Sequence, residues 1–327
     1  MNILLTAINA KYIHSNLAVY SLRACAGEYR DAVELAEYTI NNQKDYILEE
    51  LYKRKPDVLC FSCYIWNIDY VTDIAREYKK LCPSVPIWVG GPEVSYEVEA
   101  FLQENPYIDG VMIGEGEDTF RELCGYYAHK RKLSDIAGIA FRKNSTGNST
   151  SVNNIGGCKA DEIVFTSPRP IKNMSEIPFC YDTLDDFSNR IIYYESSRGC
   201  PFSCSYCLSS VDKTLRFRDT RIVKRELKFF IDQKVPQIKF VDRTFNCNHA
   251  HAMELWRFIK ANDNGVTNFH FEISADLLNQ EELELISDMR PGLIQLEIGV
   301  QSTNEVTIKE IHRTMKLERL KEVVKLI

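Results

Sequence analysis

The sequence predicts an α/β protein with two domains, a doubly wound parallel sheet followed by a partial (β/α) barrel. Short apolar segments alternate with amphipathic segments over residues 1–129, and the same alternation resumes at Ile191. Such alternation is typical of parallel strands that are connected and covered by helices. A segment with three prolines separates the two series. We therefore expect one domain at 1–140, a hairpin and an extended linker at 141–188, and a second domain at 189–327.

The composition is that of a globular protein of ordinary charge. Hydrophobic residues make up 45% and charged residues 26% of the 327 residues, which is enough chain for two cores. The net charge of −6 gives no overall attraction to nucleic acid. No apolar run reaches the length of a membrane span, and the start at Met1–Thr6 resembles a first buried strand more than a signal peptide. We therefore expect a cytoplasmic protein without a membrane or nucleic acid partner.

The first domain is predicted from apolar runs and from apolar residues at helical spacing. Its expected strands are Ile3–Ala7, Ala32–Tyr38, Asp57–Ser62, Pro86–Gly90 and Gly110–Ile113. Its expected helices are Asn16–Ala26, Lys44–Lys53, Ile68–Leu81, Val94–Glu104 and Asp118–His129. Ligands of doubly wound sheets bind beyond the carboxyl ends of the strands. The glycine-bearing turns "VGGPE" and "IGEGE" fall at two of these ends.

The middle of the chain predicts a hairpin followed by a linker. Ile139–Arg142 and Glu162–Thr166 are expected to be its two strands, with a polar segment as the tip between them. The prolines that follow favour extended backbone over helix, so we expect an extended connection to the second domain.

The second domain is predicted as four βα units of barrel type. Its expected strands are Ile191–Glu195, Gln237–Asp242, Asn268–Ile273 and Leu293–Gly299. Its expected helices are Arg221–Gln233, His249–Ala261, Gln280–Met289 and Thr303–Ile311. A complete barrel of eight units needs more chain than this, and the last residues, 323–327, are still largely apolar. We therefore expect a barrel that is truncated after its fourth unit.

Cysteine is frequent and its count, eleven, is odd. In a reducing compartment these residues are not expected to form a disulfide framework. Free cysteine often behaves as a small core residue, and four cysteines in apolar surroundings fit that description: Cys25, Cys60, Cys82 and Cys124.

The segment "SSRGCPFSCSYCLSS" places Cys200, Cys204 and Cys207 within eight residues of a turn-like loop. Closed zinc sites take four ligands, whereas three thiolates suit a cubane iron–sulfur cluster that leaves one iron open to a small molecule. Gly199 would let the backbone approach a large cofactor. A zinc site would need a fourth ligand, for which the candidates are Cys180, Cys247, His249 and His251. The spacing therefore favours an iron–sulfur centre over zinc or inert thiols.

The sequence "RGCPFSCSYC" resembles the cluster motif of the radical S-adenosylmethionine (radical SAM) superfamily, including the aromatic Tyr206 before the third cysteine. The resemblance implies that Cys200, Cys204 and Cys207 hold a [4Fe–4S] cluster whose fourth iron is chelated by SAM. One electron from a flavodoxin- or ferredoxin-type donor would then cleave SAM and form a 5′-deoxyadenosyl radical. That radical would abstract hydrogen from a small-molecule or peptide substrate, which the sequence does not identify. Catalytic residues are likewise unidentified.

The same resemblance indicates cofactor contacts at the ends of the later strands. The segments are "KFVDRTFN", "FEISADLL" and "LEIGVQSTN", although the glycine pair and glutamate frequent in the first of them are absent. The candidate SAM contacts are Tyr206, Asp242, Thr244, Glu272, Ser274, Glu297 and Gln301. For each carboxylate, the alternative is a barrel-interior residue paired with a neighbouring Arg or Lys.

The first domain resembles that of the cobalamin-binding class of radical SAM proteins in "DVLCFSCYIWN", "IWVGGPEVS" and "DGVMIGEGEDTFREL". The "NAKYIHSNLAVYSLRA" start further resembles an uncharacterised subgroup of this class. The resemblance implies that turns after the later strands cradle the corrin and its nucleotide tail. The candidate cobalamin contacts are Ser62, Gly90, Gly91, Gly114, Glu115 and Gly116. Glu117 is instead expected to favour the start of the following helix.

The Asp-x-His-x-x-Gly signature whose histidine ligates cobalt is absent, and His14 is expected to be a polar loop residue. The main interpretation is a cobalamin-dependent radical SAM enzyme. Methylation of an unactivated carbon is the commonest chemistry of this class, and rearrangement and ring formation also occur in it. One alternative is a radical SAM enzyme without functional cobalamin, such as a methylthiotransferase, although the first domain lacks a second cysteine trio and the chain lacks a basic tail. The other alternative is a metal-binding scaffold without enzymatic activity.

Overall fold

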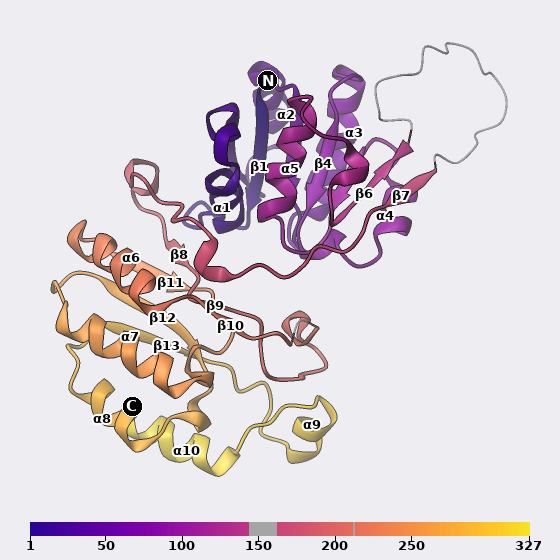
Figure 1. Ribbon diagram of the computed structural model, residues 1–327. Coiled ribbons are helices and arrows are strands. Elements are labelled where there is room, and N and C mark those ends of the chain that lie inside the picture. Colours follow the sequence, from indigo (N-terminus) through magenta and orange to yellow (C-terminus); the bar gives the residue numbers. More distant parts are fainter. Residues whose placement is uncertain (144–161, 212) are drawn as a thin grey trace, which may run out of the picture. The chain divides into compact units, whose positions relative to one another are not determined.

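The computed structural model describes residues 1–143, 162–211 and 213–327 (Figure 1). The described chain divides into two compact units. The first comprises Met1–Lys172 and Ile177–Arg190, and the second comprises Asn173–Glu176 and Ile191–Ile327. The polar segment predicted as the hairpin tip lies outside the described residues. No helix of the described ranges is long and apolar enough to cross a bilayer.

The first unit is built on a seven-stranded sheet with the order β2-β1-β3-β4-β5-β6-β7. Its strands are β1 (Ile3–Asn9), β2 (Val33–Thr39), β3 (Val58–Ser62), β4 (Ile87–Gly90), β5 (Gly110–Met112), β6 (Ile139–Arg142) and β7 (Ile163–Phe165). The first five strands pair in parallel. β6 and β7 add an antiparallel hairpin at one edge. The predicted doubly wound sheet is therefore confirmed, with this hairpin as its edge.

Helices cover this sheet because the strands are buried along their length. Every residue of β1 and β3 is buried, as expected for central parallel strands. The helices are α1 (Leu17–Cys25), α2 (Lys44–Arg54), α3 (Ile68–Leu81), α4 (Val98–Glu104) and α5 (Glu117–Tyr127). α1 packs beside α5, and α2 packs beside α3. The strand order reverses between β1 and β3, so a ligand crevice is expected at their carboxyl ends.

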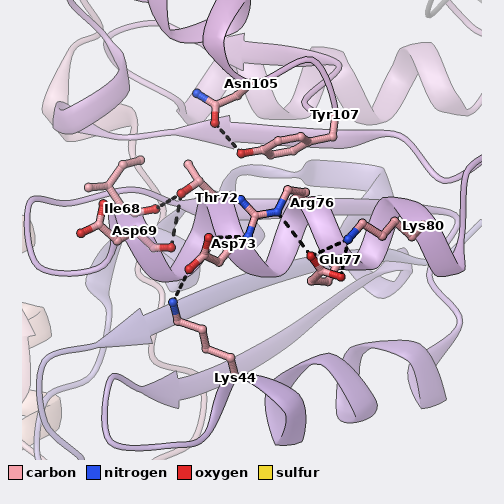
Figure 2. A network of polar contacts seen from close by, with 10 residues as sticks. All are labelled: Lys44, Ile68, Asp69, Thr72, Asp73, Arg76, Glu77, Lys80, Asn105 and Tyr107. Atoms are coloured by element: carbon pink, nitrogen blue, oxygen red, sulfur yellow. Dashed lines mark hydrogen bonds and ion pairs between the residues drawn. The ribbon is translucent and has the colours of Figure 1, made fainter.

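The solvent-facing side of α3 carries a chain of charged side chains (Figure 2). Asp73 accepts hydrogen bonds from Lys44 of α2 and from Arg76. Glu77 accepts from Arg76 at 3.3 Å and from Lys80 at 2.7 Å. Exposed pairs of this kind contribute about 0.5 kcal/mol each. α3 is therefore held mainly by its buried apolar face, and the charges fix its contact with α2.

The second unit contains a four-stranded parallel sheet with the order β13-β12-β11-β8. Its strands are β8 (Ile192–Tyr194), β11 (Gln237–Phe240), β12 (Asn268–Ile273) and β13 (Ile294–Ile298). Its helices are α6 (Thr220–Asp232), α7 (His249–Ala261), α8 (Gln280–Ser287), α9 (Glu305–Glu310) and α10 (Leu317–Leu326). The sheet does not close on itself within the described residues, so the predicted partial barrel is confirmed.

Short polar side chains define where the helices of the second unit begin. In α8, Asn279 accepts from the Glu282 amide and the Glu282 carboxylate accepts from the Asn279 amide, which forms a capping box. Three more helices begin after a residue whose side chain accepts from the first turn: Asp219, Asn248 and Asn304. These capping residues can be recognised in the sequence, and each marks the residue at which a helix begins.

We predict that Gly91→Ala destabilises the first unit strongly. Gly91 has φ +123°, and an added Cβ would lie 2.4 Å from the Cys63 carbonyl oxygen. The expected loss is about 3 kcal/mol in the free energy of unfolding, from backbone strain and this clash. Trp88, which is buried in β4, reports the transition by fluorescence during urea titration.

The matched control is Gly265→Ala in the second unit. Gly265 also has a positive φ, +76°, but an added Cβ would meet nothing within 4 Å. This substitution should cost only about 1 kcal/mol of strain. Equal losses in the two variants would contradict the packing account of Gly91.

Candidate functional site

The cysteine-bearing loop, residues 199–215, is closed at its base by a pair of short antiparallel strands. β9 (Ser197–Arg198) pairs with β10 (Arg216–Phe217). Gly199 has φ +92°, and an added Cβ would lie 2.5 Å from the Thr214 carbonyl oxygen. The structure therefore gives Gly199 a role in packing the loop on itself, and the cofactor approach predicted from the sequence stays a prediction.

The three thiols of this loop occupy the carboxyl-end side of β8. Cys200 and Cys204 are buried and Cys207 is half-buried. Among the described residues, no three His, Cys, Asp or Glu side chains converge closely enough to hold a single metal ion. A cubane cluster does not require such convergence, because each thiolate binds a different iron.

Cys247 is the described thiol that lies near this loop. Burial, and then the neighbouring Cys200, raise the pKa of Cys247 to about 11. Cys247 itself lies outside the loop, at the end of the short helical segment Phe245–Cys247 that follows β11. The donor set of the loop is three cysteines, which fits a cubane cluster with one iron open to an outside ligand.

Asp242, just beyond β11, holds the segment that leads into the cysteine loop. The residue is fully buried. Its Oδ2 accepts from the Ser196 amide at 3.0 Å, and its Oδ1 accepts from the hydroxyls of Ser196 at 2.7 Å and Ser197 at 2.5 Å. His251 Nε2 lies 3.0 Å from Ser196 Oγ. The predicted SAM contact Asp242 therefore directs both carboxylate oxygens at the protein itself.

The ionisation of this buried group follows from its surroundings. Burial raises the pKa of Asp242 to about 6, although the hydrogen bonds from Ser197 and Ser196 act in the opposite direction. Burial also lowers the pKa of His251 to about 4. At neutral pH the network therefore joins a carboxylate to a neutral imidazole through the Ser196 hydroxyl, which can donate to Asp242 while accepting from His251.

Two of the predicted carboxylates lie on the polar face of the second sheet. Glu272 and Glu297 are register partners on β12 and β13. Lys239 Nζ lies 2.8 Å from Glu297 and 3.8 Å from Glu272, and His270 Nε2 lies 3.0 Å from Glu297. Burial raises the pKa of Glu272, whereas Lys239 lowers that of Glu297.

The sequence prediction omitted Lys239 and His270, which join these carboxylates. Their signal is the alternation of polar and apolar residues along β11 and β12, which places both on the face opposite the helices. The pairing agrees with the barrel-interior alternative for Glu297, whose charge is already compensated.

The other predicted contacts of the second unit lie at strand ends. Asn246, fully buried, donates to the Ser274 carbonyl at 2.9 Å and accepts from the Ser274 amide at 3.0 Å, which ties the ends of β11 and β12. Thr244 is half-buried, and its hydroxyl donates to the adjacent Arg243 carbonyl. Gln301 is exposed with φ +56°. Tyr206 is 49% exposed.

In the first unit, Ser62 lies at the switch point where β1 and β3 end. Its buried hydroxyl accepts from Asn16 Nδ2 at 3.2 Å, and Asn16 also caps α1. In the following loop Tyr64 and Trp66 stack with ring centroids 4.4 Å apart, and Ile65 is 78% exposed. These residues were absent from the prediction, although "CYIWN" carries them. Exposed apolar and aromatic side chains at the carboxyl ends of these strands suit a large, partly apolar ligand.

The four predicted glycines differ in what surrounds them. At Gly91 an added Cβ would clash with the Cys63 backbone, so the position requires glycine. At Gly116 an added Cβ would lie 2.9 Å from Leu22 of α1. At Gly90 an added Cβ would make ordinary contact with Met112. Gly114, with φ +75°, borders open space within 4 Å. Gly114, at the carboxyl end of β5, therefore provides the room that a bound corrin or its tail would need.

Glu115 is held by the first part of the proline-rich connection. The Lys172 amide donates to Glu115 at 3.2 Å, and Lys172 Nζ pairs with Asp118 at 2.8 Å. Arg169 donates to Thr119 Oγ1 at 2.9 Å. Residues 167–172 are thus fastened to the turn that precedes α5, a contact that the sequence prediction of a plain linker omitted.

Comparison with known proteins assigns both units to families. The family model described as "B12 binding domain" matches residues 3–124, and the model described as "Radical SAM superfamily" matches residues 194–327. The chain is therefore a tandem of a cobalamin-type α/β domain and a radical SAM barrel domain. It belongs to the radical SAM superfamily, in the class whose members carry a B12 binding domain.

Two relatives illustrate the range of this class. An uncharacterised methyltransferase of Pyrococcus horikoshii, PH0819, is 30% identical over 218 residues, which cover 64% of this chain and 44% of that protein. The cobalamin-dependent radical SAM methyltransferase TokK of Streptomyces tokunonensis is 30% identical over 252 residues, 70% of this chain and 33% of that protein. The chain thus spans less than half the length of these relatives.

Two solved structures share the fold. OxsB with aqua-cobalamin and SAM bound has a TM-score of 0.75 at 16% identity, covering 99% of this chain and 47% of that chain. TsrM from Kitasatospora setae, with tryptophan and a SAM analogue bound, has a TM-score of 0.71 at 16% identity, covering 100% and 65%. These two structures show that the fold is shared. The relatives PH0819 and TokK, both named methyltransferases, do not favour the methylthiotransferase or scaffold alternatives.

We predict that Asp242→Ala destabilises the second unit by about 3 kcal/mol, because it leaves three buried donors unpaired. Ser197→Ala removes one of these hydrogen bonds and should cost about 1 kcal/mol. Asp232→Ala, at an exposed ion pair with Lys228, is the control and should change stability by less than about 0.5 kcal/mol. Urea unfolding followed through buried Trp256 measures all three variants. A loss at Asp242 no larger than at Asp232 would refute this role.

Proposed function

We propose that this protein is a cobalamin-dependent radical SAM enzyme that cleaves SAM reductively and methylates an unactivated carbon. The observation that carries the proposal is the trio of cysteines in a loop after the first barrel strand, in a chain whose other unit is a B12 binding domain. The relative TokK is itself named a cobalamin-dependent radical SAM methyltransferase. Because the chain spans only part of its relatives, substrate and reaction are assigned here as a proposal.

The second unit would hold the cluster through Cys200, Cys204 and Cys207. When bound, the cluster supplies the electron for reductive cleavage of SAM, and cobalamin supplies the carrier for the methyl group. The protein's own contribution is to fix the loop through the buried contacts of Asp242. The burial of Cys200 and Cys204 keeps water from their sulfurs.

The first unit would hold cobalamin at the carboxyl ends of its strands. The open space at Gly114 and the exposed Tyr64–Trp66 stack support this placement. The fastened Glu115 and the Ser62–Asn16 hydrogen bond would define the polar walls of the crevice. The sequence offers no cobalt-ligating histidine signature, so the proposal includes no protein ligand to cobalt.

The expected partners follow from the chemistry. A flavodoxin- or ferredoxin-type protein would supply the electron, and the acceptor of the methyl group would be a small molecule or a peptide. A cytoplasmic location would keep both the thiols and the electron donor reduced.

We predict that anaerobic reconstitution of the full chain yields about four irons per chain and a broad absorbance band at about 400 nm, as a single cubane cluster requires. Alanine at Cys200, Cys204 or Cys207 should remove both signals, because each thiolate binds one iron. Cys60→Ala and Cys124→Ala, at cysteines buried in the first unit, are the controls and should retain iron. Normal iron and sulfide in the loop variants would show that the cluster lies elsewhere.

We predict that Gly114→Leu weakens cobalamin binding by about tenfold or more, because the added side chain fills the space left open at the end of β5. Gly265→Leu is the matched control, since it has nearly the same φ and equally open surroundings. Titration of the full chain with hydroxocobalamin, followed by its absorbance shift, measures both. If the wild-type chain and Gly114→Leu bind equally, cobalamin does not occupy this crevice.

A further inference from the structure

Arg313 joins the cysteine loop to two segments that are far from it in the sequence. It lies between α9 and α10, where its Nη1 donates to the Tyr206 hydroxyl at 2.8 Å. Its Nη2 donates to the Gly299 carbonyl at the end of β13. Beside these contacts, the Ser205 amide donates to the Ile311 carbonyl at 2.9 Å. One guanidinium therefore spans the cysteine loop and the loop that follows the fourth barrel strand.

The segments that meet at Arg313 are held in unfavourable backbone conformations. Gln301 has φ +56° and His312 has φ +53°. A Cβ at Gly299 would lie 2.8 Å from Nε2 at the end of the Gln301 side chain, so that side chain folds back against Gly299. Left-handed conformations of non-glycine residues persist where the surrounding contacts impose them, and they concentrate at functional sites.

The contact suits arginine specifically. A planar guanidinium can reach a hydroxyl and a carbonyl oxygen at once through separate N–H groups, whereas the single ammonium of lysine cannot keep both directions. Arg313 Nε is buried and has no hydrogen-bond partner among the described residues. Such an uncompensated donor is costly, so the two Nη contacts must offset this cost for Arg313 to keep its position.

We propose that Arg313 is a positioning residue of the SAM site. By bridging Tyr206 and Gly299, it fixes the third-cysteine end of the loop against the loop that carries Gln301. The two candidate SAM contacts, Tyr206 and Gln301, would thereby be held in position to contact the same SAM molecule. This inference rests on the proposed function, because it assigns the arrangement to SAM binding at the cluster.

The test uses the anaerobically reconstituted full chain and four variants: Arg313→Lys, Tyr206→Phe, the double variant, and Arg319→Lys as control. Arg319 lies on α10 and donates to the Leu278 carbonyl, away from the cysteine loop. SAM is titrated against the reduced cluster and its electron paramagnetic resonance spectrum is followed. Iron content and thermal unfolding of every variant are measured in parallel. Tyr206→Phe removes only the hydroxyl group that Arg313 contacts and keeps the ring.

We expect all variants to keep about four irons, and the SAM dissociation constant to rise about tenfold in both single variants. The double variant should be no weaker than Arg313→Lys, because both changes break the same contact. Arg313→Lys binding SAM as tightly as Arg319→Lys, or losses that multiply in the double variant, would overturn the inference alone. A wild-type chain that assembles no cluster would overturn the proposed function and this inference together.

Discussion

A buried carboxylate governs the arrangement on which the second unit depends. Asp242 has no exposed surface, and a charge in that position is tolerated only when it is fully hydrogen-bonded. Its three donors all come from Ser196 and Ser197, the residues that precede the cysteine loop. Satisfying Asp242 therefore fixes the direction in which the chain leaves β8. The β9–β10 pair and Gly199 then close the loop at its base.

Both units use the same geometric principle. Parallel strands bring their carboxyl ends to one edge, where the following loops can converge on a ligand. In the first unit this edge carries Ser62, the glycine turns and the Tyr64–Trp66 stack. In the second it carries the cysteine loop, Asn246 and the loop of Gln301. The two sheets differ in topology, yet in each unit the candidate ligand-binding residues lie mainly in loops at the strand ends rather than in the core.

The elements of the fold were predictable because their signals are local. Apolar runs located β1 and β3, and helical spacing gave α3 with its bounds unchanged, Ile68–Leu81. The capping box at Asn279 is visible in four consecutive residues. The short strands β9 and β10 were missed, because two-residue pairings leave no periodic signal.

The candidate site was predictable only where its chemistry is local. The cysteine spacing is such a signal, whereas Arg313 reaches Tyr206 across 107 positions of sequence. Lys239 donates a hydrogen bond to Glu297, which is 58 positions away in the sequence, and Arg169 donates one to Thr119, which is 50 positions away. The residues that flank Arg313, Lys239 and Arg169 in the sequence do not indicate which side chains these cations contact. The same limit applies to Asp242, because the sequence around it does not indicate that Ser196 and Ser197 donate to its carboxylate.

The central claim is that three cysteines of one loop hold a cluster with one iron left for SAM. Mössbauer spectroscopy of the full chain, reconstituted with ⁵⁷Fe and measured before and after SAM is added, tests it most directly. The account predicts a single iron site whose parameters separate from the others when SAM binds. A spectrum that SAM leaves unchanged would contradict the account, as would a chain that retains zinc and no iron.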